Sequence, residues 1–253
     1  MSLAILTDTT KCIGCAECVK ACKDSHHLDD DRPRQWHRND GLSARNWTSI
    51  IIREGDHYIR KQCNHCLEPA CVSACPVGAL VTTPEGAVRY DASKCIGCRY
   101  CMIACPYGIP RYDWDKAVPY VQKCDMCYER ISRGKQPACT EACPTEATIF
   151  GDREKLLAEA QRRIAAEPNK YINHIYGLTE VGGTSVLYIS DISLDFLSYP
   201  LRSLKQPLPD TTSLAMHTVP PAFVGMGAIM GGLYWFCKRR EKIGREKEEG
   251  ESS

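Results

Sequence analysis

Cysteine is the residue type in this chain whose number and spacing could do chemistry. The sequence has 253 residues and 17 cysteines, and sixteen of the cysteines fall into four groups of four. Group one is Cys12, Cys15, Cys18 and Cys22; group two is Cys63, Cys66, Cys71 and Cys75; group three is Cys95, Cys98, Cys101 and Cys105; group four is Cys124, Cys127, Cys139 and Cys143. The seventeenth, Cys237, stands apart from them.

Three chemistries could use such groups. Disulfides need a separate partner at a defined distance for every cysteine, which closely spaced triplets do not offer. Zinc sites use Cys-x2-Cys pairs and four thiolates. A [4Fe–4S] cluster takes three thiolates from one short loop, spaced Cys-x2-Cys-x2-Cys, and a fourth from elsewhere. Groups one and three have this spacing, and Pro76, Pro106 and Pro144 follow the last cysteine of groups two to four. The spacing therefore favours iron–sulfur clusters over zinc or disulfides.

The chain also repeats itself. Residues 12–22 and 95–105 share Cys, Ile, Gly and Ala at matching places, and residues 69–76 match residues 137–144. Groups one and three are thus one kind and groups two and four another. A bacterial two-cluster ferredoxin holds one group of each kind, with ligands that cross over between them. The sequence predicts two such units, an inner one at about 55–112 inserted into an outer one.

Crossing of the ligands predicts four [4Fe–4S] clusters, each with three cysteines of one group and a fourth from the paired group. Cluster 1 takes Cys12, Cys15, Cys18 and Cys143; cluster 2 takes Cys22, Cys124, Cys127 and Cys139; cluster 3 takes Cys63, Cys66, Cys71 and Cys105; cluster 4 takes Cys75, Cys95, Cys98 and Cys101. These cysteines are the predicted iron ligands. His65 lies inside group two but is not expected to bind iron, because four cysteines suffice.

Charged and polar residues near the groups give no sign of catalysis. His26 and His27 are expected to face solvent. The nearby lysines could raise cluster potentials, but a solvated face is the favoured interpretation; they are Lys11, Lys20, Lys23, Lys94 and Lys123. No Gly-rich phosphate loop and no Gly-x-Ser-x-Gly motif is present, so no catalytic residue is predicted. A formal net charge of +1 gives no indication of nucleic-acid binding.

The elements that must position the cysteines are short, and the expected fold class is α+β. Strands are predicted within 45–52, 57–60, 86–90 and 185–190, and a helix at 152–167 with Asp152 as its N-cap. The predicted organisation is a four-cluster domain at 1–150, a helix-and-strand extension packing on it at 151–202, a linker at 203–214, a transmembrane helix at 215–237 and a charged tail at 238–253.

Residues 215–237 contain no charged side chain, and a helix of about 20 apolar residues crosses a bilayer. A buried core helix is the rival interpretation. The basic run at 238–240 would lie in the cytoplasm by the positive-inside rule, which puts the cluster domain outside a cytoplasmic membrane crossed once. The N-terminal residues do not resemble a signal peptide, so export with a partner that carries the signal is expected. The alternative is a cytoplasmic domain with an anchored tail.

Small and polar residues in this segment could make contacts in the membrane. The glycine-rich run at 225–232 lets helices pack closely, so it is expected to meet another membrane subunit. His217 could approach a quinone or haem in that subunit, but an interfacial polar residue is the favoured interpretation.

Longer runs carry a family resemblance. "CRYCMIACPYGIPRYD" at 98–113, "KQPACTEACPTEATIFG" at 135–151 and "EVGGTSVLYIS" at 180–190 are similar to the four-cluster iron–sulfur subunit of membrane-bound respiratory oxidoreductases. "LSARNWT" at 42–48 looks like the formate dehydrogenase β subunit, whereas "RKQCNHC" at 60–66 looks like the Hyb-type iron–sulfur subunit of uptake hydrogenase.

The resemblance implies an electron-transfer subunit that is not an enzyme on its own. Four clusters in a row would relay single electrons between a catalytic subunit and a quinone-reactive membrane subunit of haem-containing or haem-free type. The catalytic subunit would be a molybdenum or tungsten formate dehydrogenase or a nickel–iron hydrogenase. The alternatives are a subunit that wires a molybdenum-enzyme reductase, with electrons running the other way, or a zinc-binding scaffold. Membrane lipid is an expected partner and nucleic acid is not.

Overall fold

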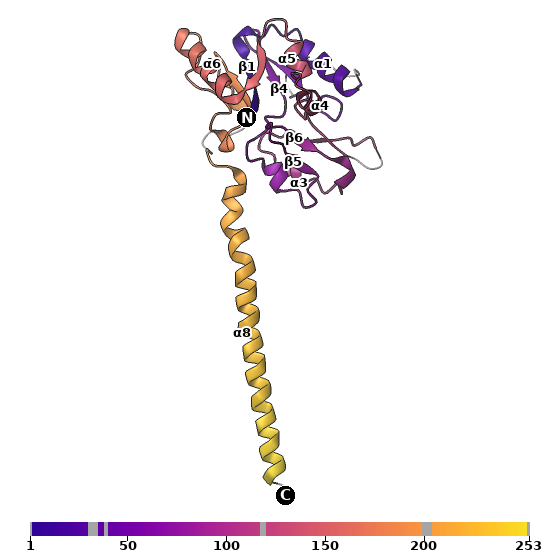
Figure 1. Ribbon diagram of the computed structural model, residues 1–253, viewed down its shortest axis with the longest axis vertical. Helices are drawn as coiled ribbons and strands as arrows, with labels where there is room; N and C mark the ends of the chain where they lie inside the picture. Colours follow the sequence, from indigo (N-terminus) through magenta and orange to yellow (C-terminus); the bar gives the residue numbers. More distant parts are fainter. Residues whose placement is uncertain (1, 30–34, 38–39, 117–119, 199–203, 252–253) are drawn as a thin grey trace. The chain divides into compact units, whose positions relative to one another are not determined.

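The structure is a computed structural model that describes residues 2–29, 35–37, 40–116, 120–198 and 204–251 (Figure 1). The chain divides into two compact units, Met1–Pro209 and Asp210–Ser253, each described by itself. The strands are β1 (Leu3–Asp8), β2 (Gln35–Trp36), β3 (Ser49–Arg53), β4 (His57–Lys61), β5 (Leu80–Thr82), β6 (Val88–Tyr90), β7 (Arg111–Tyr112), β8 (Val121–Gln122), β9 (Thr148–Asp152) and β10 (Val186–Ile189). The α-helices are α1 (Glu17–His26), α2 (Ala70–Ser73), α3 (Tyr100–Ala104), α4 (Tyr128–Ile131), α5 (Ala138–Glu141), α6 (Arg153–Ala166), α7 (Asp195–Ser198) and α8 (Leu208–Glu251). Short 3-10 helices are η1 (Thr9–Lys11), η2 (Ala92–Lys94) and η3 (Glu180–Gly182). This mixture of helices and strands agrees with the predicted α+β class.

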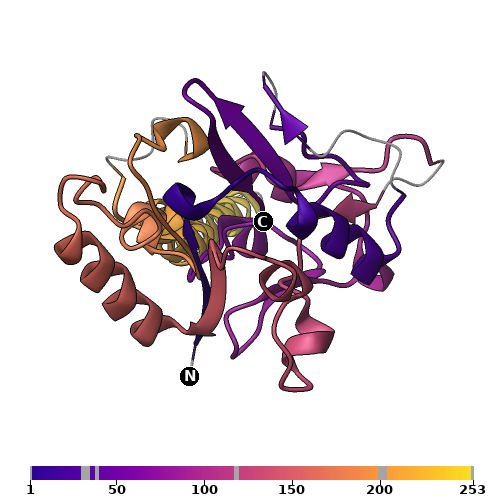
Figure 2. The ribbon, with the colours of Figure 1, turned by 90° about the horizontal axis from the view of Figure 1, so that it is seen from above.

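A three-stranded sheet of order β10-β1-β9 frames the first unit, with β1 parallel to β10 and antiparallel to β9. Side chains alternate across β1, because successive residues of a strand point to opposite faces. Ala4 and Leu6 pack with the apolar stripe of α6, whereas Ile5 packs with Ile59 and Met126 on the cysteine side. Figure 2 shows α6 beside this sheet. The sheet therefore separates the helix from the cysteine-rich loops.

Several predicted elements are present. The helix predicted at 152–167 is α6, and the carboxylate of Asp152 accepts hydrogen bonds from the backbone N–H groups of Glu154 and Lys155. The strand predicted at 185–190 is β10. The predicted pair at 45–52 and 57–60 is the antiparallel hairpin β3–β4, although β3 begins only at Ser49.

Strand β4 leads directly into group two, and its burial is unusual. Ile59, Arg60 and Lys61 are all buried, so both faces of the end of this strand are covered. A strand with polar residues on a covered face needs partners for them. Lys61 pairs with Asp40 at 3.1 Å on one side, and Arg60 points to the other.

The second unit is almost entirely the helix α8. It begins at Leu208, inside the segment expected as a linker, and continues through residues expected as a charged tail. The tail is rich in Glu, Lys and Arg, which favour helical backbone, so the helix does not stop at the end of the apolar segment. Among the described residues, this helix is the one that is long and apolar enough to cross a membrane. Its large apolar side chains, such as Phe223 and Ile229, are exposed in the structure.

Asp8, at the end of β1, ties the sheet to α6 and to the start of group one. Its carboxylate is fully buried and accepts hydrogen bonds from the Thr10 backbone N–H at 3.2 Å and from the Tyr171 hydroxyl at 2.9 Å. It also pairs with the Arg163 guanidinium at 3.1 Å. Asp91 caps η2 in the same way before group three, but it is solvent-exposed.

Replacing Asp8 with alanine should therefore destabilise the chain far more than replacing its counterpart Asp91. Asp8→Ala removes the cap and half of a buried ion pair, which costs on the order of 3 kcal/mol of the free energy of unfolding. Asp91→Ala removes a solvated cap and should cost less. Urea unfolding of the detergent-solubilised chain under anaerobic conditions measures both. Equal losses in the two variants would contradict this role for Asp8.

Candidate metal centres

Groups one and three share a local geometry that curls the backbone around a small volume. Gly14 and Gly97 have φ of 70° and 71° between the first two cysteines, and Ala16 and Arg99 are also left-handed before α1 and α3 begin. Left-handed backbone is rare for residues with a side chain. A Cβ at Gly14 would lie 2.4 Å from a ring carbon of Tyr58, so glycine is required there.

Groups two and four share a different geometry. In each, a proline, Pro69 or Pro137, precedes a one-turn helix that carries the third cysteine of the group. The proline has no backbone N–H to satisfy and its φ suits a helix start. The third cysteines, Cys71 and Cys139, are 9% and 6% exposed. The repeats seen in the sequence are therefore repeats of backbone shape.

The tertiary structure brings group one to group four, and group two to group three. Helix α1 packs on α5, and α2 packs on α3. Cys18 and Cys139 belong to one apolar core cluster, and Cys71 and Cys101 belong to another. The negative charges of neighbouring thiolates act across the groups as well: after burial, Cys139 is the thiolate that most raises the pKa of Cys22.

A third contact joins the two pairs of groups. Cys63 of group two and Cys124 of group four share a core cluster with Tyr107 and Ile109. Shared core clusters therefore link group one to group four, group four to group two, and group two to group three. Thiolates also act between these clusters, since Cys22 and Cys63 both raise the pKa of Cys124, after the larger effect of burial. The four groups form one connected series.

The donor set fits metal ions. All seventeen cysteines are free thiols, so the structure contradicts a disulfide framework. Burial and then the charges of neighbouring thiolates raise the pKa of Cys22 and Cys124 well above its usual value. In Cys71 the same two causes raise the pKa to about 12. As thiolates these buried groups would repel one another unless cations lay among them, and bound iron would supply that charge.

Arg60 is the functional side chain that the sequence analysis missed. It is 2% exposed, and its Nη2 donates to Cys139 Sγ at 2.9 Å. Burial is the largest single effect and lowers the pKa of Arg60, but the surrounding negative charges, with Cys139 and Cys18 first among them, together outweigh burial and raise it. The sequence predicted a strand at 57–60 but not that group four would cover the face of this strand that carries Arg60. Cys139 lies 79 residues away along the chain, so no local pattern indicates the contact.

The lysines near the groups do not all face solvent. Lys20 and Lys94 are exposed as expected, but Lys23 is 2% and Lys123 is 5% exposed. The buried Lys123 ammonium donates to the carbonyl oxygens of Val88 and Cys124. The expectation of a solvated face is thus wrong for Lys23 and Lys123, because loops distant in sequence fold over them.

Two buried hydrogen-bond donors next to group two lack a protein partner among the described residues. His65 is fully buried; its Nδ1 accepts from the Val88 backbone N–H at 2.9 Å, and its Nε2 has no partner. Gln62 Nε2 is likewise unpartnered. Both residues adjoin cysteines of group two, where sulfur acceptors of a bound cluster would satisfy such donors.

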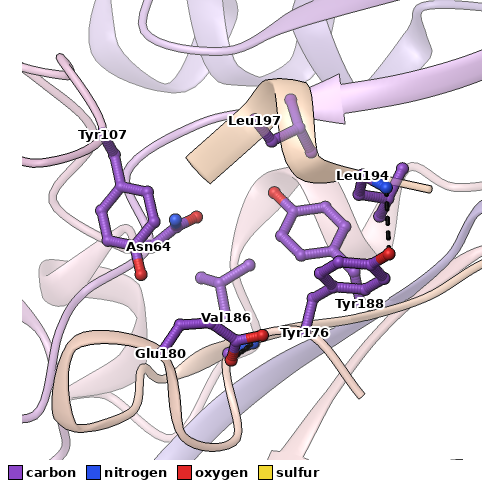
Figure 3. A pocket seen from close by; sticks show the side chains of 9 residues that line it. Asn64, Tyr107, Tyr176, Glu180, Val186, Tyr188, Leu194 and Leu197 are labelled. Atoms are coloured by element: carbon purple, nitrogen blue, oxygen red, sulfur yellow. Dashed lines mark hydrogen bonds between the residues drawn. The ribbon is translucent and has the colours of Figure 1, made fainter. Parts of the chain in front are cut away.

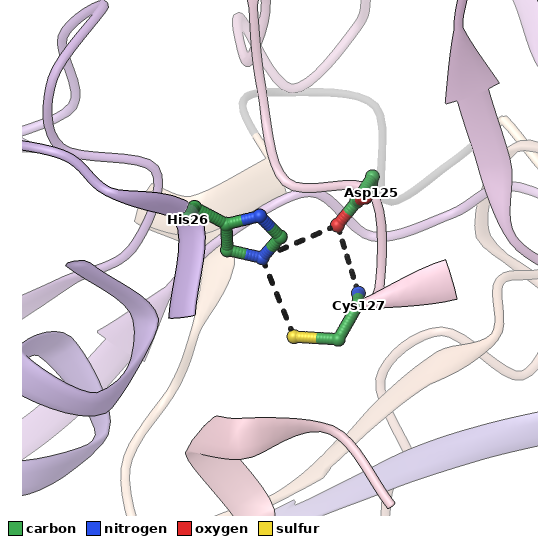
Figure 4. Close-up of side chains that lie close together, drawn as sticks. All are labelled: His26, Asp125 and Cys127. Atoms are coloured by element: carbon green, nitrogen blue, oxygen red, sulfur yellow. Dashed lines mark hydrogen bonds and ion pairs between the residues drawn. The ribbon is translucent and has the colours of Figure 1, made fainter. Parts of the chain in front are cut away.

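His26 is not solvent-facing, contrary to expectation. Its side chain is 16% exposed and stacks near Trp47, with ring centroids 4.6 Å apart. Its Nε2 lies 3.4 Å from Asp125 Oδ1 and 3.4 Å from Cys127 Sγ, and Figure 4 shows the ring pointing toward both side chains. The three side chains could hold a metal ion, but Cys127 already belongs to group four. The histidine and aspartate therefore surround a cysteine of the series and do not form a separate site.

A small cavity of about 20 Å³ lies near the junction of groups two and three (Figure 3). Tyr107, Tyr176 and Tyr188 line it with Glu180, whose carboxylate accepts from the Gly177 backbone N–H at 2.8 Å. His174 Nε2 lies 2.6 Å from the same carboxylate. A space of this size holds about one water molecule, so it is no substrate pocket.

Comparison with known proteins gives two family matches and several relatives. Residues 56–153 match one 4Fe-4S dicluster domain model and residues 11–80 match another, and together these ranges contain all four groups. The chain is 36% identical to the Hydrogenase-2 operon protein HybA of Escherichia coli O157:H7, over 95% of this chain and 85% of that protein. It is 36% identical to the nitrate-inducible formate dehydrogenase iron-sulfur subunit of Escherichia coli K12, over 74% of this chain and 67% of that protein. It is 39% identical to the probable anaerobic dimethyl sulfoxide reductase chain YnfG of the same strain, over 64% of this chain and 78% of that protein.

These matches confirm the resemblance drawn from the cysteine runs. The two dicluster models succeed each other along the chain and overlap at residues 56–80, so they do not describe one unit inserted in the other. The packing of α1 on α5 and of α2 on α3 is a feature of the tertiary structure alone.

Substitution of His65 separates a structural role from iron binding. Asn at this position keeps an acceptor for the Val88 N–H and tolerates the φ of 47°. Leu at this position leaves that buried N–H unpaired, at a cost of about 1–3 kcal/mol. We therefore expect His65→Asn to retain full iron and most of its stability, and His65→Leu to unfold at lower urea. Loss of a whole cluster in His65→Asn would mean that His65 is a ligand.

Proposed function

Because this chain belongs to the 4Fe-4S dicluster family of iron–sulfur subunits, we propose that it relays single electrons between a catalytic subunit and a quinone-reactive membrane subunit. Its relatives include a hydrogenase-2 operon protein, a formate dehydrogenase iron-sulfur subunit and a probable anaerobic dimethyl sulfoxide reductase chain. Bound [4Fe–4S] clusters supply one-electron redox chemistry. The chain itself supplies thiolates, burial and fixed charge.

The observation that carries this proposal is the connected series of cysteine groups. An electron relay requires redox groups held close together along a path, and core contacts link groups one and four, then four and two, then two and three. A scaffold of independent zinc sites has no need for such continuity. The order cluster 1, cluster 2, cluster 3, cluster 4 follows from these contacts.

The ligand sets proposed are the crossed ones. Cluster 1 is held by Cys12, Cys15, Cys18 and Cys143, and cluster 2 by Cys22, Cys124, Cys127 and Cys139. Cluster 3 is held by Cys63, Cys66, Cys71 and Cys105, and cluster 4 by Cys75, Cys95, Cys98 and Cys101. Thiolate influence supports the crossing: Cys143 raises the pKa of Cys12, after the larger effect of burial. Cys63, Cys105 and Cys71 act together in the same way on Cys66, again after burial. The inner unit, about 55–112, is thereby inserted in the outer one.

The proposed partners are those that the family resemblance implies, and similarity to a hydrogenase-2 operon protein and to a formate dehydrogenase subunit supports them. A catalytic subunit with nickel–iron, or with molybdenum or tungsten, would stand at one end of the series, and an integral membrane subunit at the other. Quinone reduction at the membrane then completes the transfer. The similarity to a dimethyl sulfoxide reductase chain keeps the opposite direction of flow as the second candidate, with electrons leaving the membrane for a molybdenum enzyme.

The helix α8 is proposed to cross the cytoplasmic membrane once. Residues 215–237 carry no charge and the basic residues Lys238, Arg239 and Arg240 follow at once. Positive residues are retained on the cytoplasmic side, so the tail lies there and the cluster domain lies outside. The domain would be exported with a partner that carries the signal.

Pairs of cysteine substitutions test the ligand sets in the intact complex, extracted anaerobically in mild detergent. The four clusters should contribute about 16 irons per chain, four per cluster, in addition to the iron of the partner subunits. Cys12→Ser with Cys143→Ser removes two ligands of one crossed cluster and should lower the iron content by about 4, whereas Cys124→Ser with Cys143→Ser touches two clusters and should lower it by about 8. Elemental analysis reads all three samples, and nickel, molybdenum or tungsten in the parent identifies the catalytic partner.

The opposite pattern in those variants, with the first pair losing two clusters and the second pair one, would show that each group binds its own cluster. Zinc in place of iron in the parent would remove the electron-transfer proposal altogether.

Reporter fusions to the C-terminus test the orientation of α8 in cells that contain the partner subunits. A fluorescent protein that matures only in the cytoplasm should be active, and an alkaline phosphatase that needs the exterior should be inactive, because the basic residues stay inside. Replacing Lys238, Arg239 and Arg240 by Ser should weaken this bias. An active phosphatase on the unaltered chain would place the tail outside.

A further inference from the structure

Arg60 carries a buried positive charge to which the proposed relay assigns no role. Its Nη2 donates to Cys139 Sγ at 2.9 Å and to Gln62 Oε1. Its Nη1 donates to Thr148 Oγ1 at 2.9 Å, and its Nε donates to Thr48 Oγ1 at 3.2 Å. The pairing of β4 with β3 fixes the backbone that carries this side chain. Each of the three guanidinium nitrogens donates a hydrogen bond, which fixes the group itself.

No carboxylate among the described residues forms an ion pair with Arg60. Its hydrogen-bond partners are hydroxyl and amide oxygens and one cysteine sulfur. Burying a cation without a counter-charge costs several kcal/mol, so a protein retains one only where negative charge is nearby. The nearby negative charge comes from cysteines: Cys139 in contact, and Cys18 in the same core cluster as Cys139.

Arg60 lies next to two of the four proposed ligand sets. Cys139 belongs to the set of cluster 2 and Cys18 to the set of cluster 1, so the guanidinium lies where these two sets meet. A cluster becomes more negative by one charge when it is reduced. A fixed cation in a buried, low-dielectric site stabilises the more negative state and raises the reduction potential.

We propose that Arg60 is a fixed charge that raises the reduction potential of cluster 2 through its contact with Cys139, and that of cluster 1 to a smaller extent. The proposal rests on the proposed function, because it requires clusters at these cysteines. Arg60 holds no iron, and its charge does not change with pH in the working range. It makes the Cys18–Cys139 junction a favourable place for an electron to reside.

Redox titration of the intact complex, followed by electron paramagnetic resonance, tests the assignment. In Arg60→Met we expect the ratio of reduced to oxidised cluster 2 at a fixed potential to fall at least about tenfold, which is about 59 mV for one electron. The signal of cluster 2 is identified by its loss in Cys124→Ser. Arg60→Lys keeps the charge and should retain most of the potential. Lys20→Met is the matched control, since it removes one exposed charge from α1 between ligands of the same two sets.

Unchanged potentials in an iron-replete Arg60→Met complex would overturn the proposal and leave the electron-transfer function standing. Absence of iron from the parent complex would instead remove the proposed function itself. Arg60→Gln keeps hydrogen-bond donors without charge and provides the same comparison if Arg60→Met does not assemble. Failure of both neutral variants beside a fully loaded Arg60→Lys would assign Arg60 to assembly of the site, which also overturns a role in setting the potential.

Discussion

Mutual repulsion among buried thiolates is the constraint on which the rest of this structure depends. The four groups of cysteines form one connected series, and burial first, then the charges of neighbouring thiolates, raises the pKa of Cys22 and Cys124. Such a core cannot be held together by apolar packing alone, because the thiolates that bind a metal are charged. Bound metal ions would supply most of the compensating positive charge. Buried cationic side chains of the protein would balance the negative charge that remains.

The frame that holds the cysteines is built from strands and one long helix rather than from the cysteine loops. β1 joins β9 and β10 although these strands lie far away in the sequence, and α6 covers the opposite face. Asp8 links this frame to the start of group one, because its carboxylate caps η1 and also pairs with Arg163 of α6. The counterpart Asp91, before group three, pairs with Lys94 of the same turn at 3.7 Å and not with a distant helix.

Charge is distributed unevenly along the series of cysteines. Arg60 lies at the junction of groups one and four, and Lys123 lies beside Cys124, which shares a core cluster with Cys63 of group two. Groups one and three are nearly identical in backbone shape, yet only the first faces a buried arginine among the described residues. Repeated loops can therefore bind the same kind of cofactor while the surrounding strands give each copy a different electrostatic environment.

The sequence by itself determined the chemistry: the spacing of the cysteines, the prolines after them and the internal repeat identified iron–sulfur binding, because ligand geometry is encoded locally in a few consecutive residues. It also located α6, β10 and the β3–β4 hairpin, whose patterns are local as well. The sequence did not predict strands β1 and β9, the burial of His26 and Lys123, or the start of α8 at Leu208. These features became known from the tertiary structure. The internal repeat predicted that group one pairs with group four, but only the tertiary structure placed Arg60 against Cys139, because burial and charge pairing depend on segments that meet across long stretches of chain.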